Sequence, residues 1–275
     1  MRLLALLAGS ILCGAVSLAA SEPLLQGWVA VQTGSSSNST KLVAQILNVS
    51  PQNRFLNLLL VRLKDTQGFI YPPTDYDVGG SLGTSIDMLL PGEVLWVSWE
   101  FDSPLRGRPA ELIVEFSNWD PAAYPQYFTV LDTPVPDSSM LKMSIPYLNK
   151  DQPAVFCKLD WNLAEPLRDA SKETIAFIVA VRNTSSSSTV SFSDERLLLP
   201  VLKDTKGRIA RFLPNSYSFF ASLPEQLRPG ETVNVECTVD TTSLEPPFFF
   251  ILRRGLFIDE SEEIAWLLWR DPSGY

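Results

Sequence analysis

Apolar and polar residues alternate with a period of two along many short segments of this chain. The clearest examples are residues 95–101 and 233–239, in which every second side chain is apolar. A period of two places the apolar side chains on one face of a pleated strand. Turn residues interrupt these segments every few positions, and 21 prolines are spread along the chain, which argues against long helices. The pattern therefore predicts an all-β protein with antiparallel strands, not a β-α-β arrangement.

The second feature of the chain is an internal repeat. The hexapeptide at 63–68 (LKDTQG) recurs at 202–207 (LKDTKG), and the tripeptide PGE at 91–93 recurs at 229–231 with nearly the same spacing. In each copy the Asp and Gly of the hexapeptide predict a hairpin turn, with Gly at the position of positive φ. The predicted turn residues are Asp65, Gly68, Pro91 and Gly92 in the first copy and Asp204, Gly207, Pro229 and Gly230 in the second.

The repeat divides the chain into a first domain at 21–132, a proline-containing linker at 133–153 and a second domain at 154–275. Opening strands are predicted at 28–32 and 155–161. Each domain has room for about seven short strands. Two tandem immunoglobulin-like antiparallel β-sandwiches are the simplest architecture that fits this count.

The same residues carry a resemblance to a known family. The order of Asn, Leu-x-Asp-x-x-Gly, Leu-x-Pro-Gly-Glu and Phe-Asp resembles secreted bacterial immunoglobulin-like domains of the structural group that contains the mycobacterial immunoprotective extracellular antigen. The second copy departs from it where Arg228 precedes Pro229 and where Val239 replaces Phe. The resemblance implies a sandwich fold and an extracytoplasmic setting, and it implies no shared catalytic residues. In the first copy it rests on Asn48, Leu63, Asp65, Gly68, Leu90, Pro91, Gly92, Glu93, Phe101 and Asp102.

Residues 1–20 have the features of an export signal: a single basic residue, an apolar stretch and small residues before a cleavage point. We predict cleavage and a secreted or periplasmic protein. The alternative is an uncleaved N-terminal membrane anchor, since the apolar stretch is about long enough to span a bilayer. After removal of the signal, no other segment is apolar enough to be a transmembrane candidate.

Composition narrows the function classes. The formal net charge of −9 argues against nucleic acid as a partner, because an acidic protein repels the phosphate backbone. The chain has no histidine, which excludes Ser-His-Asp and Cys-His catalysis and His-containing metal sites. No pattern selects catalytic, cofactor-binding or metal-binding residues, so none is predicted.

Cys157 and Cys237 are the two cysteines outside the predicted signal, and each lies on the apolar side of an alternating segment. In an oxidising compartment they are candidates for a disulfide bond across one sandwich. The alternative is two separate buried thiols that pack as small apolar side chains.

Three other segments each allow two interpretations. The basic cluster Lys203, Lys206, Arg208 and Arg211 is either an anion-binding surface or a solvated hairpin edge. Asn48 and Asn183 begin Asn-x-Ser/Thr sequons, which carry glycans only in a eukaryotic secretory pathway. The apolar stretch at 264–269 either packs on its own domain or exposes an aromatic strand to a partner.

These features predict an exported, non-catalytic interaction module of the cell envelope whose protein partner the sequence does not identify. Two alternatives remain at this point. A carboxylate-dependent hydrolase requires a cleft lined by paired acids, and a small-ligand or metal-binding periplasmic protein requires a concave pocket with converging polar groups.

Overall fold

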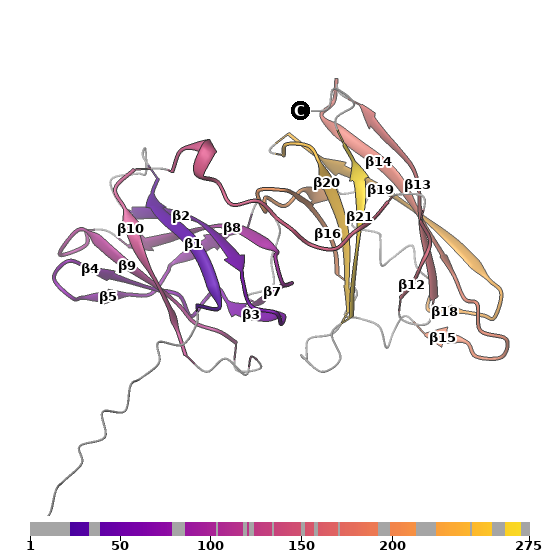
Figure 1. Cartoon of the computed structure of the whole chain (residues 1–275), viewed down its shortest axis with the longest axis horizontal. Helices are drawn as coiled ribbons and strands as arrows, with labels where there is room; N and C mark the ends of the chain where they lie inside the picture. The colour runs from indigo at the N-terminus through magenta and orange to yellow at the C-terminus, as the bar shows by residue number, and fades with distance from the viewer. Residues whose placement is uncertain are drawn as a thin grey trace, which may run out of the picture.

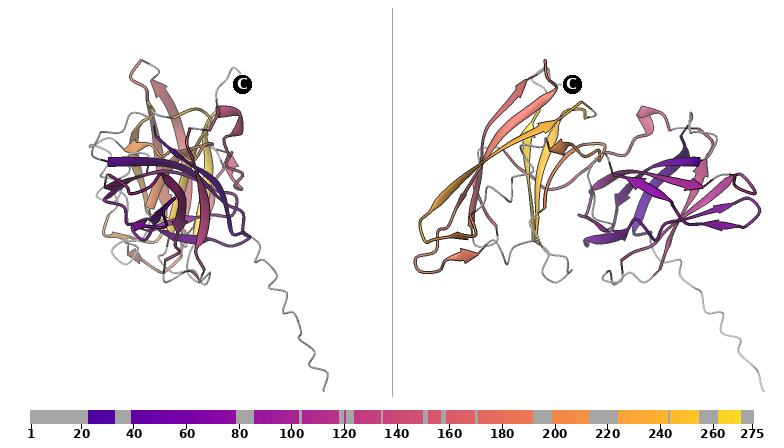
Figure 2. Two further views of the ribbon diagram at one scale, coloured as in Figure 1. Left: turned by 90° about the vertical axis from the view of Figure 1, so that its left-hand side faces the viewer. Right: turned by 180° about the vertical axis from the view of Figure 1, so that it is seen from behind.

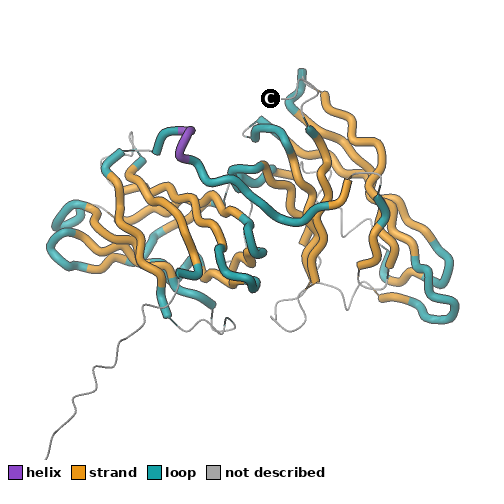
Figure 3. Tube along the Cα trace, viewed as in Figure 1, coloured by secondary structure: helices purple, strands orange, loops and turns teal. Residues whose placement is uncertain are grey.

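The computed structural model describes residues 23–32, 39–78, 86–102, 104–117, 120, 124–133, 135–149, 152–156, 159–169, 171–191, 199–212, 224–242, 244–254 and 262–270. The predicted export signal at 1–20 lies outside them. The described chain is almost entirely β, as predicted, and the one helical element is the 3₁₀ turn η1 (Asp137–Ser139), coloured purple in Figure 3. Within the described residues no helix is long and apolar enough to cross a membrane.

Unit 1 is built from the first ten strands: β1 (Leu25–Val31), β2 (Ser39–Asn48), β3 (Arg54–Asn57), β4 (Arg62–Asp65), β5 (Ile70–Tyr71), β6 (Asp75–Asp77), β7 (Ile86–Leu89), β8 (Val94–Asp102), β9 (Pro109–Val114) and β10 (Gln126–Leu131). Eight of them follow the order β5-β4-β9-β10-β1-β2-β8-β6. Strand β1 pairs antiparallel with β2 and parallel with β10. It therefore joins two four-strand halves, and a single apolar core packs between them.

Unit 2 contains the remaining strands: β11 (Leu148–Asn149), β12 (Ala154–Phe156), β13 (Leu159–Asp169), β14 (Thr174–Arg182), β15 (Val190–Ser191), β16 (Leu199–Asp204), β17 (Arg211–Phe212), β18 (Gln226–Leu227), β19 (Thr232–Asp240), β20 (Phe248–Arg254) and β21 (Glu262–Trp269). Nine of them form one sheet in the order β11-β21-β20-β16 and a second in the order β12-β13-β14-β19-β17, and β15 pairs with β18 alone. A separate apolar core lies between these two sheets.

The two units lie side by side, and residues 135–147, here called the strap, run between them (Figures 1 and 2). The strap and β11 fall within the segment predicted as a linker. At its end β11 pairs parallel with β21 in unit 2, just as β1 pairs parallel with β10 in unit 1.

The predicted alternation holds in the long strands. Leu95, Val97, Trp99 and Phe101 are all buried in β8, and Val235, Cys237 and Val239 are buried in β19.

The apolar stretch at 264–269 belongs to β21, where Trp266 is fully buried beside β20. The prediction that it packs on its own domain is confirmed.

The opening strand predicted at 155–161 is wrong. β12 and β13 form a hairpin there, in which Val155 pairs with Asp160. Val155 is 75% exposed, whereas Leu159 and Trp161 on the second strand are fully buried. The alternating pattern arose from the end of one strand and the start of the next, and a period of two does not reveal where one strand ends and the other begins.

Candidate functional site: the junction between the two units

Strand β20 is apolar on both faces, and this makes a junction possible. All residues from Phe248 to Arg253 are buried. One face fills the core of unit 2, and the other contributes to an apolar cluster between the units. The strand in the same place in unit 1, β9, has a half-buried glutamate on it, Glu111, and a second one, Glu115, directly after it. The buried members of the cluster come from unit 1, the strap and unit 2: Val94, Met143, Ile145, Phe249, Ile251 and Ala265.

The tip of the hairpin after β16 docks on unit 1 and the strap through three successive carbonyl groups. The carbonyl of Thr205 accepts from the Met143 amide at 2.7 Å, and that of Gly207 accepts from the Trp96 amide at 3.2 Å. The carbonyl of Lys206 accepts from Nε2 of Gln45 at 2.8 Å. Gly207 has a φ of 85°, and a Cβ at this position would lie 2.5 Å from the Val94 carbonyl oxygen. Glycine is therefore required both for the turn and for the close approach to unit 1.

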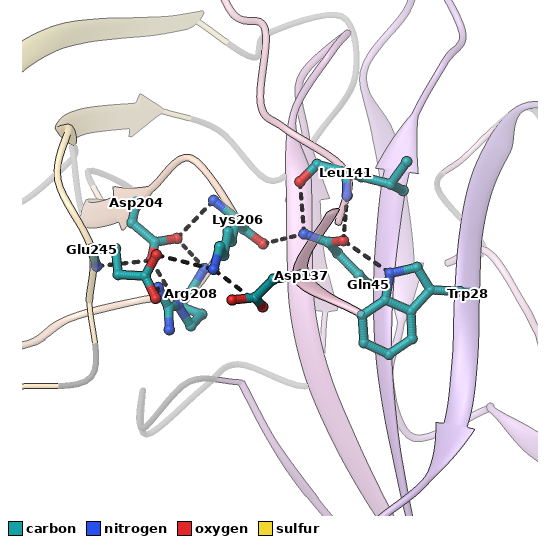
Figure 4. Close-up of polar contacts among 8 residues, drawn as sticks. All are labelled: Trp28, Gln45, Asp137, Leu141, Asp204, Lys206, Arg208 and Glu245. Atoms are coloured by element: carbon teal, nitrogen blue, oxygen red, sulfur yellow. Dashed lines mark hydrogen bonds and ion pairs between the residues drawn. The ribbon is translucent and has the colours of Figure 1, made fainter. Parts of the chain in front are cut away.

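Gln45 is the polar centre of the junction (Figure 4). It lies in β2 and is fully buried. Its Oε1 accepts from Nε1 of Trp28 at 3.0 Å and from the Leu141 amide at 2.7 Å. Its Nε2 donates to the Leu141 carbonyl at 2.8 Å as well as to Lys206. The amide thus makes the four hydrogen bonds available to it and ties unit 1, the strap and unit 2 together.

A buried group of three charges reinforces the contact. The Glu93 carboxylate accepts from Nζ of Lys203 at 2.6 Å and from Nη2 of Arg253. All three side chains are at most 4% exposed. Burial alone would raise the pKa of Glu93, but the charges of Arg253 and Lys203 outweigh it and hold the pKa below its usual value.

A ring of partly exposed ion pairs surrounds the hairpin tip (Figure 4). Lys206 contacts Asp137 of the strap at 3.5 Å and Glu245 at 3.0 Å, and Arg208 contacts Glu245 at 3.2 Å. Neither interpretation of the basic cluster holds for Lys203, Lys206 and Arg208. They face neither an external anion nor open solvent, because unit 1 and neighbouring carboxylates cover them. Nothing is described for the side chain of Arg211.

The predicted turn residues occupy turns in both units. Gly68, Gly92, Gly207 and Gly230 all have positive φ values between 77° and 86°. Pro91 and Pro229 directly precede two of these glycines.

Asp65 and Asp204 each stabilise a hairpin by accepting hydrogen bonds with the side-chain carboxylate, but the pKa values of the two carboxyl groups shift in opposite directions. Asp65 accepts from the amides of Gln67, Phe69 and Gly107 and from the Tyr71 hydroxyl. Burial would raise its pKa, but these hydrogen bonds lower it. Asp204 accepts from the amides of Lys206, Arg208 and Glu245 and from Nε of Arg208. Burial outweighs the Arg208 charge here and raises the pKa of Asp204.

Asn48 and Asn183 have a structural role at corners. Both side chains are fully buried. Nδ2 of Asn48 donates to the Leu89 carbonyl at 2.9 Å, and Nδ2 of Asn183 donates to the Leu227 carbonyl at 2.8 Å. Because this nitrogen is the atom that would carry a glycan, these two sequons are not accessible for glycosylation in the folded protein.

Cys237 is a buried thiol in β19, and burial raises its pKa to about 12. Cys157 lies outside the described residues, so the predicted disulfide between them stays a prediction.

The buried carboxylates of the described residues serve structural purposes. Asp65, Glu93 and Asp204 hold turns and the junction as described above, and Asp120 pairs with Arg54 at 3.1 Å while accepting from the Phe55 amide. Within the described part of the chain, no group of three or more Cys, Asp or Glu side chains is placed to hold a metal ion.

One feature of the amino-acid sequence does indicate this junction. The run FFFIL at 248–252 has no polar position, whereas its counterpart in the first copy reads ELIVE. A strand without alternation is buried on both faces. The role of Gln45 had no comparable signal, since a lone Gln in an apolar strand does not reveal its partners.

Comparisons with known proteins add little to this description. No protein-family model and no curated protein matches the chain. A Porphyromonas gingivalis W83 protein of unknown function matches structurally with a TM-score of 0.23 and 10% identity over 89% of this chain and 98% of its own. Red sea bream transglutaminase matches with a TM-score of 0.25 and 8% identity over 89% of this chain and 31% of its own. Both TM-scores are too low to assign fold or function by similarity.

Proposed function

We propose that this protein is an exported, non-catalytic interaction module of the cell envelope, made of two tandem immunoglobulin-like sandwiches that bind a protein partner. The strand orders support the fold proposal. In each unit the first strand, β1 or β11, pairs parallel with the last strand, and the long strand that ends at or just before a buried Asn pairs with the strand that follows the Pro-Gly turn. This is the arrangement of an antiparallel sandwich with crossed connections.

The junction between the two units is the main observation that supports the proposed function. An apolar cluster, three carbonyl contacts and a buried charge group hold unit 2 against unit 1, whereas units joined by a flexible linker alone would move independently. Such a protein presents the outer surfaces of its two units at a fixed distance and orientation. That property suits a protein that bridges or positions another macromolecule.

Unit 2 offers exposed apolar side chains for such a contact. Leu167 is 72% exposed on β13, and Val155 is similarly exposed on the neighbouring β12. The half-buried Ile178 pairs across the sheet with Ala164. Leu167 pairs with Ala176 beside the pair Ala164 and Ile178, and a contiguous apolar surface on a sheet face is characteristic of protein contact surfaces.

The test is photo-cross-linking in the producing cell, with a photoreactive amino acid placed at Leu167, at Val155 or at the control position Lys172. The Lys172 side chain is 75% exposed but belongs to a polar turn. We expect one protein to be captured reproducibly from the Leu167 and Val155 positions and not from Lys172. Equal capture from all three positions, or adducts only between copies of the chain, would refute the proposal of a protein partner on this face.

A further inference from the structure

The outer face of the β5-β4-β9-β10 sheet in unit 1 is the counterpart of the face that unit 2 buries in the junction. In unit 2, β16 directs Lys203 toward unit 1 and β20 directs Phe249 and Ile251 toward it, and all three are buried. In unit 1 the corresponding strands lie on the side away from unit 2 (Figure 1). There Ile70 is 51% exposed and Tyr127 is 59% exposed.

Charges on this face are sorted by strand. β4 carries the cations Arg62 and Lys64, and the carboxylates Glu111 and Glu115 lie on and just after the adjacent strand β9. Lys64 pairs with Glu111 at 3.5 Å, and Arg62 pairs with Glu115. The four side chains are between 28% and 45% exposed, so they remain accessible to a second set of charges.

The apolar side chains flank this charged centre on both sides. Ile70 on β5 pairs across the sheet with Lys64, and Tyr127 on β10 pairs with Ile113 of β9. From one edge to the other the face is therefore apolar, basic, acidic and apolar.

This order makes the face complementary to itself. A two-fold axis parallel to the strands, above the line between β4 and β9, places β4 of one copy over β9 of the other. Lys64 then faces Glu111 of the partner subunit. The same rotation places Ile70 over β10, opposite Thr129 of the partner subunit and two residues along the strand from Tyr127 of the partner subunit. Each contact occurs twice.

We propose that the outer β5-β4-β9-β10 face of unit 1 is a self-association surface on which two copies of this chain form a two-fold dimer. The inference goes beyond the proposed function, because it does not depend on any other protein. The face spans only four short strands about 4.8 Å apart, so its size is at the low end of specific interfaces. We therefore expect a weak dimer with a roughly micromolar or weaker dissociation constant that rises with salt.

Charge-swapped variants of the full chain test this arrangement by sedimentation velocity over about 5–500 µM protein. We expect the unmodified protein to dimerise with increasing concentration. Lys64→Glu and Glu111→Lys should each weaken dimerisation by at least about tenfold, because like charges then face each other twice across the axis. An equimolar mixture of the two variants should dimerise again, since every facing pair in the mixed dimer has opposite charge.

Lys172→Glu is the matched control, because it makes the same charge change in an exposed ion pair with Asp169 on unit 2. It should dimerise like the unmodified protein. A protein that stays monomeric at the highest concentration would overturn the proposal. Dimerisation unchanged by Lys64→Glu, or a mixture of the two variants that stays monomeric, would overturn it as well.

Discussion

Replacing Glu93 by Gln tests whether the buried charge group holds the two units together. The substitution keeps the size of the side chain but removes the charge that Lys203 and Arg253 share. Nζ of Lys203 lies 2.6 Å from the carboxylate, and both of these side chains are fully buried. Removing one member of a buried ion pair typically costs about 3–5 kcal/mol, compared with at most about 1 kcal/mol for an exposed pair.

The second copy provides a matched control. Glu231 occupies the same Pro-Gly-Glu turn in unit 2, and its carboxylate likewise accepts from a backbone amide, that of Arg228 at 2.7 Å. Glu231 is exposed. Glu231→Gln should therefore change the free energy of unfolding by no more than about 0.5 kcal/mol.

Urea unfolding followed by tryptophan fluorescence measures both variants, because Trp99 lies in the core of unit 1 and Trp161 and Trp266 lie in that of unit 2. We expect Glu93→Gln to be less stable than the unmodified protein by several kcal/mol, and its two units to unfold at different urea concentrations. Equal decreases in the free energy of unfolding for Glu93→Gln and Glu231→Gln would refute a role of the buried charges. The decrease would then come only from the Pro-Gly-Glu turn that both residues share.

The pH dependence of stability follows from the same group. Because the pKa of Glu93 is lowered in the folded protein, its contribution is fully present above its ordinary pKa of 4.5 and is lost as the pH falls through the lower folded value. Acid unfolding of the unmodified protein should therefore be steeper than that of Glu93→Gln. If the stability of the two proteins fell in parallel with decreasing pH, Glu93 would not be the group responsible.

Three further predictions follow from the junction and the core. Gln45→Leu should destabilise the protein by about 2–4 kcal/mol, because it leaves several buried polar groups without a hydrogen-bond partner, and urea unfolding measures the loss. Gly207→Ala should cost more stability than Gly230→Ala, because both glycines have positive φ but only the Cβ at 207 would collide with unit 1; equal losses in thermal unfolding would refute this contact. Cys237 should resist iodoacetamide at pH 8 in the folded protein, because burial raises its pKa to about 12, and rapid labelling detected by mass spectrometry would contradict its burial.

The secondary structure class and most of the turns follow from the amino-acid sequence alone. Alternation placed the apolar faces of β8 and β19 correctly, because a pleated strand with one buried face needs an apolar residue at every second position. The Asp and Gly of the two hexapeptides lie in turns as expected, because their conformation depends on residues only a few positions away. The same local reasoning failed at 155–161, where the alternation continues from β12 into β13 although these are two antiparallel strands.

The contacts made by the outer faces of the strands depend instead on how the two units pack together. Lys64 and Lys203 occupy the same position in nearly identical hexapeptides, yet Lys64 is half exposed beside Glu111 and Lys203 is fully buried against Glu93. The difference arises from a contact between residues 110 positions apart. A local pattern states which side chains are apolar and where the chain turns. It does not state which distant surface covers a given face, because that depends on how whole units pack against each other.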